Sequence, residues 1–570
     1  MKKLTFGTPE KLTPSIYCKG FSYEETEISY PVDKIVFFEN ARGCCLRLPL
    51  GNDEQIYGMG LQLKIFNLRG RKIVARPNCD PVAPTGDSHA AVPFFVSTAG
   101  YGIYVDTARH AEFYFGSSNL MADRAEAAER KGIAMSTDEL YQAALNGVSN
   151  VSIQIPAAKG VDIYIIEGKN ITEIVSKYNM MSGGGVEVDE QDMLPIYRVC
   201  GKFNRAQVEA FAEQFRKDDL PIGTIGLEPG WQTRAYSCTY VFSDERFPEH
   251  ETLIQKLHDM GYRVNLWEHA FVHPDSPIYK DILPYSGDYA VWRGAVPDFS
   301  FPEARKIFAE HHRKYLIEKG IDGFKLDECD GSDFSSSWSF PCMAQFPSGL
   351  DGEQYHALLG NLYMQAILEA FGDRKPALSS VRSAGALSSA LPFVLYSDLY
   401  GHEDFIRGVA TAGFGGVLWT PEVRKAKDKE ELLRRLQSVV FSAQCLINAW
   451  YVEEEPWRGL DCLDEVRELL KLRESLVPML VKAFKKYKET GCPPIRALVS
   501  DYTNDPETYR IDNEYVFCDD LIVAPIAVGK TGREVYLPEG KWRDFFTKEP
   551  VQCGKFTVET DSIPVYEKAE

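Results

Sequence analysis

The sequence predicts a multidomain α/β protein, in which a (β/α)8 TIM barrel follows an N-terminal β-sandwich and precedes a C-terminal β domain. Its 570 residues are too many for one hydrophobic core. Short β-type runs fill the two ends of the chain, whereas apolar strands alternate with amphipathic helices between them. We therefore expect an N-terminal β-sandwich over residues 1–190, the barrel over residues 191–485 and a C-terminal β-sandwich domain over residues 486–570.

The N-terminal part contains β-type runs such as KIVFFEN, CCLRLPL and PFFVSTAGYGIYVDT, which Gly, Pro and Asn interrupt. Runs at this short spacing are typical of a β-sandwich. The helical segment ITEIVSKYNMM comes only near the end of this part. The C-terminal part returns to β-type runs, among them LIVAPIAV and KFTVET.

In the central part, segments with the hydrophobic period of a helix alternate with short apolar segments typical of buried strands. Val208, Phe211, Ala212 and Phe215 lie on one face of a helix, and Gly261 is placed to end the next one. Eight apolar segments predict the barrel strands, at residues 195–200, 222–228, 262–268, 323–328, 376–382, 393–398, 416–422 and 444–450. Eight strand–helix units make a closed barrel, whose chemistry collects at the C-terminal strand ends.

Composition excludes several functions. The net charge of −19 leaves no basic surplus for nucleic acid and disfavours an anionic membrane surface. We expect no membrane span, because no apolar run reaches about 18 residues. No apolar segment follows the first lysines, and the 13 cysteines form no CxxC pair, so we expect a cytoplasmic protein with reduced cysteines. No P-loop, HExxH or EF-hand is present, so we expect no metal and no cofactor. The oligomeric state stays open, with a homo-oligomer as one alternative.

The segment GIDGFKLDECD gives the sharpest local signal. Gly320 ends a helix, a buried strand follows, and residues two apart in that strand share a face. Lys325 and Asp327 therefore point the same way, and the lysine is expected to lower the pKa of Asp327. An ionised carboxylate in a pocket can act as a nucleophile. The alternative is a structural salt bridge at a strand end.

A second carboxylate closes another apolar strand, in FVLYSDLYGHED. Asp398 comes about two βα units after Asp327, so both carboxylates can reach one pocket. Glycoside cleavage requires such a pair, because one carboxylate attacks the anomeric carbon while an acid protonates the leaving oxygen. The alternative for Asp398 is a helix N-cap, and Glu403 and Asp404 are competing acids nearby.

Other side chains at or after strand ends suit a sugar. Aromatic faces stack on sugar rings, and five tryptophans are candidates: Trp231, Trp267, Trp338, Trp419 and Trp450. Arg382 is a candidate clamp for a hydroxyl or carboxylate. Any single tryptophan can equally belong to the core, and Arg382 can equally form a surface ion pair.

Several longer segments together resemble glycoside hydrolase family 31, the α-glucosidase and α-xylosidase family. YGMGLQLKIFNLRGRK resembles its N-terminal sandwich, and GYRVNLWEHAFVHPDSPIY resembles its third barrel unit. DPETYRIDNEYVFCDDLIVAPIAVGKTGREVYLPEGKWRDFFT resembles its domain after the barrel. The resemblance covers nearly the whole chain.

The resemblance implies roles for individual residues. FKLDECD implies that Asp327 is the nucleophile, and YSD implies that Asp398 is the general acid/base. The implied substrate-binding residues, together with the strand-end tryptophans, are Glu228, Trp231, Trp267, Lys325, Arg382, Trp419, Glu422 and Trp450. Glu228 replaces the usual aspartate, WTPEVR replaces the usual Trp-Gly-His-Asp stretch, and NAW stands where a histidine is usual. The sugar recognised is therefore expected to differ from plain glucose.

These inferences converge on a retaining, exo-acting α-glycosidase that hydrolyses a terminal α-linked sugar of a small glycoside or oligosaccharide. Retention requires the two carboxyl groups at about 5–5.5 Å. Asp398 is expected to have the higher pKa of the pair, since it must start protonated. An α-transglycosylase using the same intermediate and a non-catalytic carbohydrate-binding homologue are the alternatives.

Overall fold

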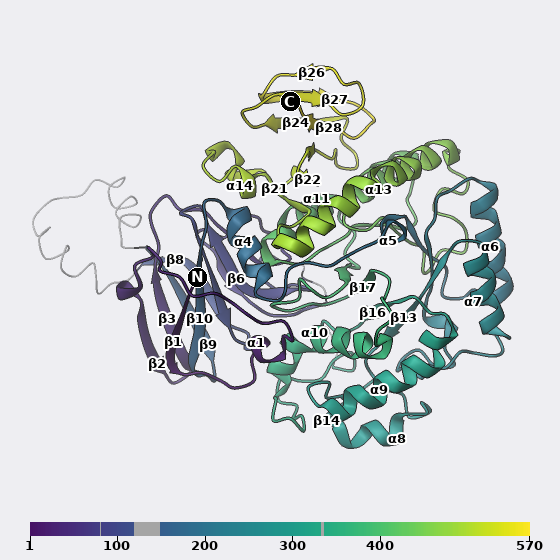
Figure 1. Ribbon diagram of the computed structural model, residues 1–570, viewed down its shortest axis with the longest axis horizontal. Coiled ribbons are helices and arrows are strands. Elements are labelled where there is room, and N and C mark those ends of the chain that lie inside the picture. The colour runs from purple at the N-terminus through teal and green to yellow at the C-terminus, as the bar shows by residue number, and fades with distance from the viewer. Residues whose placement is uncertain (80, 82, 119–148, 332–335, 570) are drawn as a thin grey trace, which may run out of the picture.

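The computed structural model describes residues 1–79, 81, 83–118, 149–331 and 336–569 (Figure 1). An N-terminal pair of β-sheets lies beside a central barrel ringed by helices, and a small β domain lies against the barrel at the C-terminal end. The predicted fold class is confirmed, with all three parts in the expected order along the chain.

The N-terminal part consists of two five-stranded antiparallel sheets. One has the order β1 (Lys2–Thr8), β10 (Lys159–Glu167), β7 (Tyr101–Asp106), β6 (Ala91–Ser97) and β4 (Ile56–Gly60). The other has the order β2 (Val36–Asn40), β3 (Gly43–Pro49), β9 (Ser149–Pro156), β8 (Glu112–Ser118) and β5 (Lys72–Val74). Apolar side chains that alternate along these strands form a core of their own, which includes Leu46, Phe95 and Ile153. Helix α4 (Ile171–Met180) ends this part, at the predicted segment.

Eight parallel strands form the barrel. They are β11 (Ile196–Arg198), β12 (Thr224–Leu227), β13 (Arg263–His269), β16 (Gly323–Asp327), β17 (Ser379–Val381), β18 (Phe393–Leu395), β19 (Glu422–Val423) and β20 (Leu446–Asn448). Their order is β18-β17-β16-β13-β12-β11-β20-β19, and a parallel bridge between Leu395 and Trp419 joins the two ends. Each predicted strand is found, although the seventh is a two-residue strand at the end of its predicted segment.

Helices connect most of the strands. They are α6 (Arg205–Lys217), α7 (His250–Asp259), α9 (Pro302–Tyr315), α10 (Gly352–Phe371), α11 (His402–Ala412), α12 (Lys429–Val440) and α13 (Leu463–Thr490). The expected helix between the fifth and sixth strands is absent, because residues 382–392 form an irregular connection. A hairpin of β14 (Ser286–Val291) and β15 (Gly294–Pro297) precedes α9.

Local signals in the sequence explain where these elements begin and end. Gly320 has φ +108° before β16, and Gly261 has φ +94° after α7, as their predicted roles as helix stops require. Helix α6 begins with a capping box between Asn204 and Gln207, and it buries Val208, Ala212 and Phe215.

The C-terminal domain contains a six-stranded sheet of β21 (Ile495–Ala497), β22 (Tyr515–Phe517), β23 (Leu521–Val523), β28 (Val565–Lys568), β25 (Trp542–Asp544) and β26 (Pro550–Val551). A two-stranded sheet of β24 (Gly532–Leu537) and β27 (Gly554–Glu559) packs with it. All 13 cysteines are free, and ten of them are buried. Among the described residues, no helix combines the length and apolar character needed to cross a membrane.

Candidate active site

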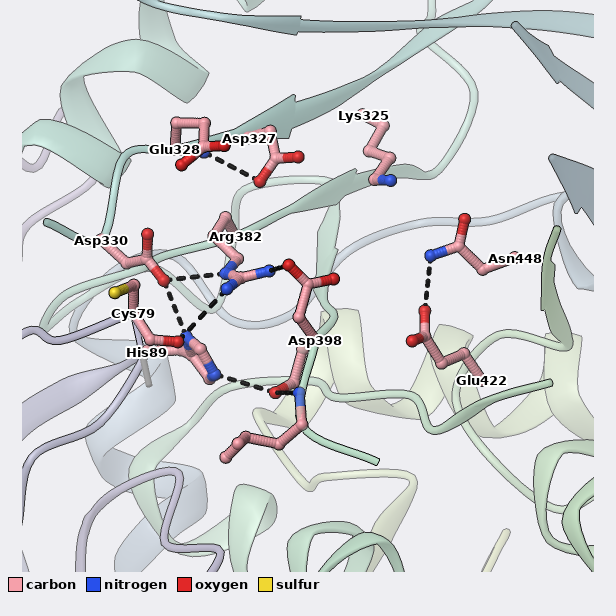
Figure 2. A network of polar contacts seen from close by, with 12 residues as sticks. Cys79, His89, Lys325, Asp327, Glu328, Asp330, Arg382, Asp398, Glu422 and Asn448 are labelled. Atoms are coloured by element: carbon pink, nitrogen blue, oxygen red, sulfur yellow. Dashed lines mark hydrogen bonds and ion pairs between the residues drawn. The ribbon is translucent and has the colours of Figure 1, made fainter. Parts of the chain in front are cut away.

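Asp327 and Asp398 lie at the same end of the barrel (Figure 2). Asp327 is the last residue of β16, and Asp398 follows the end of β18 at Leu395. Burial raises the pKa of the Tyr396 hydroxyl, and both carboxylates raise it further. The two acids therefore share one environment, at the C-terminal face where barrel chemistry collects.

The structure holds Asp327 by hydrogen bonds to both carboxylate oxygens. The indole Nε1 of Trp267 donates to Oδ2 at 2.6 Å, and the backbone N–H of Glu328 donates to Oδ1 at 2.9 Å. Trp267 lies one strand away on β13, where it pairs with Lys325 in the register. Such bonds to both oxygens fix the orientation of the carboxylate.

Lys325 forms an ion pair with an acid from another strand. Its Nζ lies 3.2 Å from Oε2 of Glu228, which also forms an ion pair with Arg198. All three side chains are buried, so the lysine neutralises an acid on β12's C-terminal end rather than forming an ion pair with Asp327. Side chains from neighbouring strands thus meet inside the barrel, and the predicted effect of Lys325 on the pKa of Asp327 stays a prediction.

Two arginines hold Asp398. Nη1 of Arg382 lies 2.6 Å from Oδ2, and Nη2 of Arg424 lies 3.1 Å from Oδ1. Burial alone would raise the pKa of Asp398, but Arg382, Arg424 and Lys325 together lower it below its ordinary value. This lowering runs against the expectation that Asp398 has the higher pKa of the pair, because two guanidinium groups lie beside its carboxylate.

Glu422 lies deep in the same site, where WTPEVR departs from the family pattern. Its carboxylate forms an ion pair with Arg424 and accepts a hydrogen bond from Asn448 Nδ2 at 2.6 Å. Burial raises the pKa of Glu422, although Arg424 opposes that effect. Oδ1 of Asn448 is buried and has no hydrogen-bond partner among the described residues.

Sequence reasoning missed Glu328, the residue after the nucleophile candidate. Its backbone has φ +56°, a left-handed conformation that costs a non-glycine residue about 1–2 kcal/mol. Burial raises its pKa well above the ordinary value, and Asp327 raises it further. Glu328 is therefore a second carboxyl group next to Asp327, in surroundings that raise its pKa.

The tryptophans predicted to bind substrate have different surroundings. Trp267 contacts Asp327, whereas Trp231 is fully buried and donates from Nε1 to the backbone carbonyl of Trp267 at 2.6 Å. Trp231 thus supports β13 and presents no surface to a sugar. Trp419 is also buried, against Phe405 of α11. Trp450 is 41% exposed and contacts the Tyr451 ring.

A row of aromatic rings extends from Trp267. The ring centroids of Tyr236 and Trp267 are 5.4 Å apart, those of Tyr236 and Trp292 are 4.9 Å apart, and those of Trp292 and Trp338 are 6.0 Å apart. Tyr236, next to Trp267, and Trp338, at the other end of the row, are both about half exposed. The three rings beyond Trp267 come from three different loops, and of these three only Trp338 was a candidate from the sequence.

Asp404, one of the two competing acids, is engaged elsewhere, whereas Glu403 is exposed on α11. Asp404 forms ion pairs with Lys64 and Arg407 at the start of α11. Among the described residues, no group of three or more His, Cys, Asp or Glu side chains could hold a metal ion.

The chain matches two family models. The model of the glycosyl hydrolases family 31 TIM-barrel domain matches residues 196–483, and that of the family 31 C-terminal domain matches residues 491–570.

Relatives agree with these matches. An alpha-xylosidase of Emericella nidulans is 22% identical over 96% of this chain and 70% of its own length. The alpha-xylosidase XylQ of Lactiplantibacillus pentosus is 23% identical over 87% of this chain and 64% of its own length. The structure of a family 31 dextranase of Flavobacterium johnsoniae superposes with a TM-score of 0.80, at 22% identity, over 93% of this chain and 67% of that one. The chain therefore belongs to glycosyl hydrolase family 31, a family of glycoside hydrolases that act on O-glycosyl bonds.

Proposed function

We propose that this protein is a retaining, exo-acting α-glycosidase, with Asp327 as nucleophile and Asp398 as general acid/base. The observation that carries the proposal is the carboxylate of Asp327, held by Trp267 and by a backbone N–H, with a second carboxylate from the next-but-one strand in the same site. This is the pair of groups that a double displacement at an anomeric carbon needs.

The mechanism follows from these positions. Asp327 attacks the anomeric carbon, and the bond to the leaving oxygen breaks as that oxygen takes a proton from Asp398. A covalent glycosyl-enzyme results. Asp398, now ionised, takes a proton from water, which attacks the anomeric carbon and releases Asp327 and a sugar of unchanged configuration.

Asp398 must carry a proton to act as the acid, so the cations that lower its pKa must move or be screened. Arg382 is fixed by a second acid, Asp330, with Nε donating to Oδ2 at 2.8 Å, whereas Arg424 is shared with Glu422. We propose that substrate binding draws Arg424 toward Glu422, so that the pKa of Asp398 rises. Glu328 is the second candidate for the proton donor, since burial already raises its pKa.

The substrate is proposed to be a terminal α-linked sugar on a sugar or aryl leaving group. Buried acids and cations surround the end of the barrel, which suits hydroxyl groups. The row from Tyr236 to Trp338 offers apolar faces beyond Trp267, which suit the leaving group. Glu228 and Glu422 depart from the family pattern, and we propose that the sugar is not plain glucose.

The first experiment screens aryl α-glycosides, namely glucoside, galactoside, xyloside and N-acetylgalactosaminide, together with acidic sugars. Proton NMR of the first product identifies the anomer before it equilibrates. The α-anomer supports the proposal, whereas the β-anomer contradicts retention. A product that carries an added sugar at high acceptor concentration would favour the transglycosylase. No turnover of any substrate, with binding retained, would favour the carbohydrate-binding homologue.

The two acids are tested separately. Asp327→Ala should lose turnover, and azide should restore it with a glycosyl azide of inverted configuration. Asp398→Ala should slow substrates with poor leaving groups by about 10²–10⁴-fold and activated aryl glycosides far less. If Glu328→Gln instead shows that dependence on the leaving group, the proton donor is Glu328.

We also propose that the protein works in the cytoplasm, on the ground that its cysteines form no disulfide among the described residues.

A further inference from the structure

We infer that His89, a residue of the N-terminal sandwich part, is a positioning residue for Asp398 in the barrel. The inference rests on the proposed role of Asp398 as general acid/base. His89 is fully buried just before β6, and its imidazole reaches the C-terminal face of the barrel (Figure 2).

The hydrogen bond of Nε2 holds the backbone around Asp398. Nε2 of His89 lies 2.8 Å from Oγ of Ser397, the residue before Asp398. The same Oγ accepts a hydrogen bond from the backbone N–H of Leu399, the residue after Asp398, at 3.1 Å. The loop is therefore tied on both sides of the acid.

The contact of Nδ1 holds the carboxylate of Asp398 indirectly, through Asp330 and Arg382. Nδ1 of His89 lies 2.9 Å from Oδ2 of Asp330, which also accepts from Nε of Arg382 at 2.8 Å. The other end of this guanidinium pairs with Asp398 at 2.6 Å. Nη2 of Arg382 also donates to the backbone carbonyl of Cys79, which comes from the same segment of the sandwich part as His89, at 3.2 Å.

The charge on Asp330 indicates which nitrogen of His89 carries a proton toward it. Burial would raise the pKa of Asp330, but Arg382 and His89 lower it below its ordinary value, so the group is a carboxylate. It accepts only, and Nδ1 of His89 must carry the proton. Nε2 shares the other hydrogen bond of the ring with the Ser397 hydroxyl, whose oxygen also accepts from the backbone N–H of Leu399. Every polar atom of the imidazole has a partner, which gives the ring one fixed orientation.

Ser397, His89 and Asp330 stand in the order of a nucleophilic triad. That role does not fit here, because Ser397 and Asp330 are each 1% exposed and His89 is 0% exposed, which leaves no place for an acyl substrate. The side chain of Asp398, in contrast, is 47% exposed. A buried anchor beside a half-exposed acid restricts where the carboxylate can lie, and a displacement of about 1 Å can cost about 10²-fold in rate.

The test compares variants of His89 with a matched control. His89→Ala removes the contacts with both Ser397 and Asp330, whereas His89→Asn keeps a donor near Asp330. The control is His402→Gln. His402 is also a buried histidine between two parts of the chain, with Nε2 2.9 Å from Oγ of Ser438 and Nδ1 accepting from the backbone N–H of Val528 at 3.0 Å. No contact joins it to Asp398 among the described residues.

The readout is kcat/KM for two leaving groups on the sugar that the aryl-glycoside panel identifies, with Tm measured for each variant. His89→Ala should lower kcat/KM for the poor leaving group by about 10²-fold and for the activated one far less, with partial recovery in His89→Asn. His402→Gln should lower Tm and leave the ratio of the two substrates unchanged.

Equal losses for both leaving groups in His89→Ala, or no loss, would overturn the inference. If His89→Ala fails to fold, Ser397→Ala removes one hydroxyl and should show the same dependence in weaker form. The proposed function fails separately, when Asp398→Ala shows no dependence on the leaving group.

Discussion

Arg424 offers the sharpest test of how the site controls the proton on Asp398. The perturbation is Arg424→Met, which removes one of the two cations on the acid and keeps most of the side-chain volume. Its Nη2 lies 3.1 Å from Oδ1 of Asp398. Because the Asp398 side chain is 47% exposed, a dielectric near that of water is appropriate. Coulomb's law then gives about 1.3 kcal/mol, which corresponds to a rise of about one unit in the pKa of Asp398.

The assay is the pH dependence of kcat/KM with a poor leaving group. A general acid must be protonated, so activity is lost as pH rises through its pKa. The alkaline limb should therefore move to higher pH by about one unit in Arg424→Met. The matched control is Arg435→Met, because Arg435 stacks on the same Tyr400 ring as Arg424 and pairs with Glu431.

Loss of Arg424 also leaves Glu422 buried without its cation. Breaking such a pair costs about 3–5 kcal/mol, which should lower Tm in the single variant. The double variant Arg424→Met, Glu422→Gln removes both charges and should recover most of that stability. An alkaline limb that stays in place in both variants would refute the control of Asp398 by Arg424.

Three other predictions test the remaining contacts. Trp267→Phe removes the indole donor to Asp327, and kcat should fall by about 10–100-fold, since a hydrogen bond to a charged group contributes about 1.5–3 kcal/mol. Trp231→Phe, which removes a donor to a backbone carbonyl, should lower Tm with little change in kcat; equal effects of the two variants would contradict the assignment. Trp338→Ala should raise KM by about 2–10-fold for substrates with a sugar or aryl leaving group and leave methyl glycosides unaffected, because stacked rings contribute about 0.5–1.5 kcal/mol. Asp330→Asn should flatten the acid side of the stability curve measured by urea unfolding: the folded-state pKa of Asp330 is lowered, so its contribution is present above the unfolded pKa of about 3.9 and is lost as pH falls below it. An unchanged slope at low pH would show that Asp330 has no such contribution.

The sequence alone was sufficient to predict the barrel and to locate Asp327 and Asp398. Both acids follow short apolar segments, and a buried strand ends where its hydrophobic run ends. Such information lies within a few residues of the chain. The sequence did not predict that β17 and β18 are joined without a helix, because eight repeats of one strand–helix pattern suggested eight helices.

The tertiary structure alone decided the partners of these acids. Lys325 pairs with Glu228 rather than with its neighbour Asp327, and Arg424 reaches Asp398 from another strand. His89 contacts Asp330 and Ser397, which come 241 and 308 positions later in the chain. The pKa of Asp398 falls rather than rises for the same reason, since the field at a carboxylate depends on which charges the fold brings within a few ångströms, and no local pattern in the sequence records those distances.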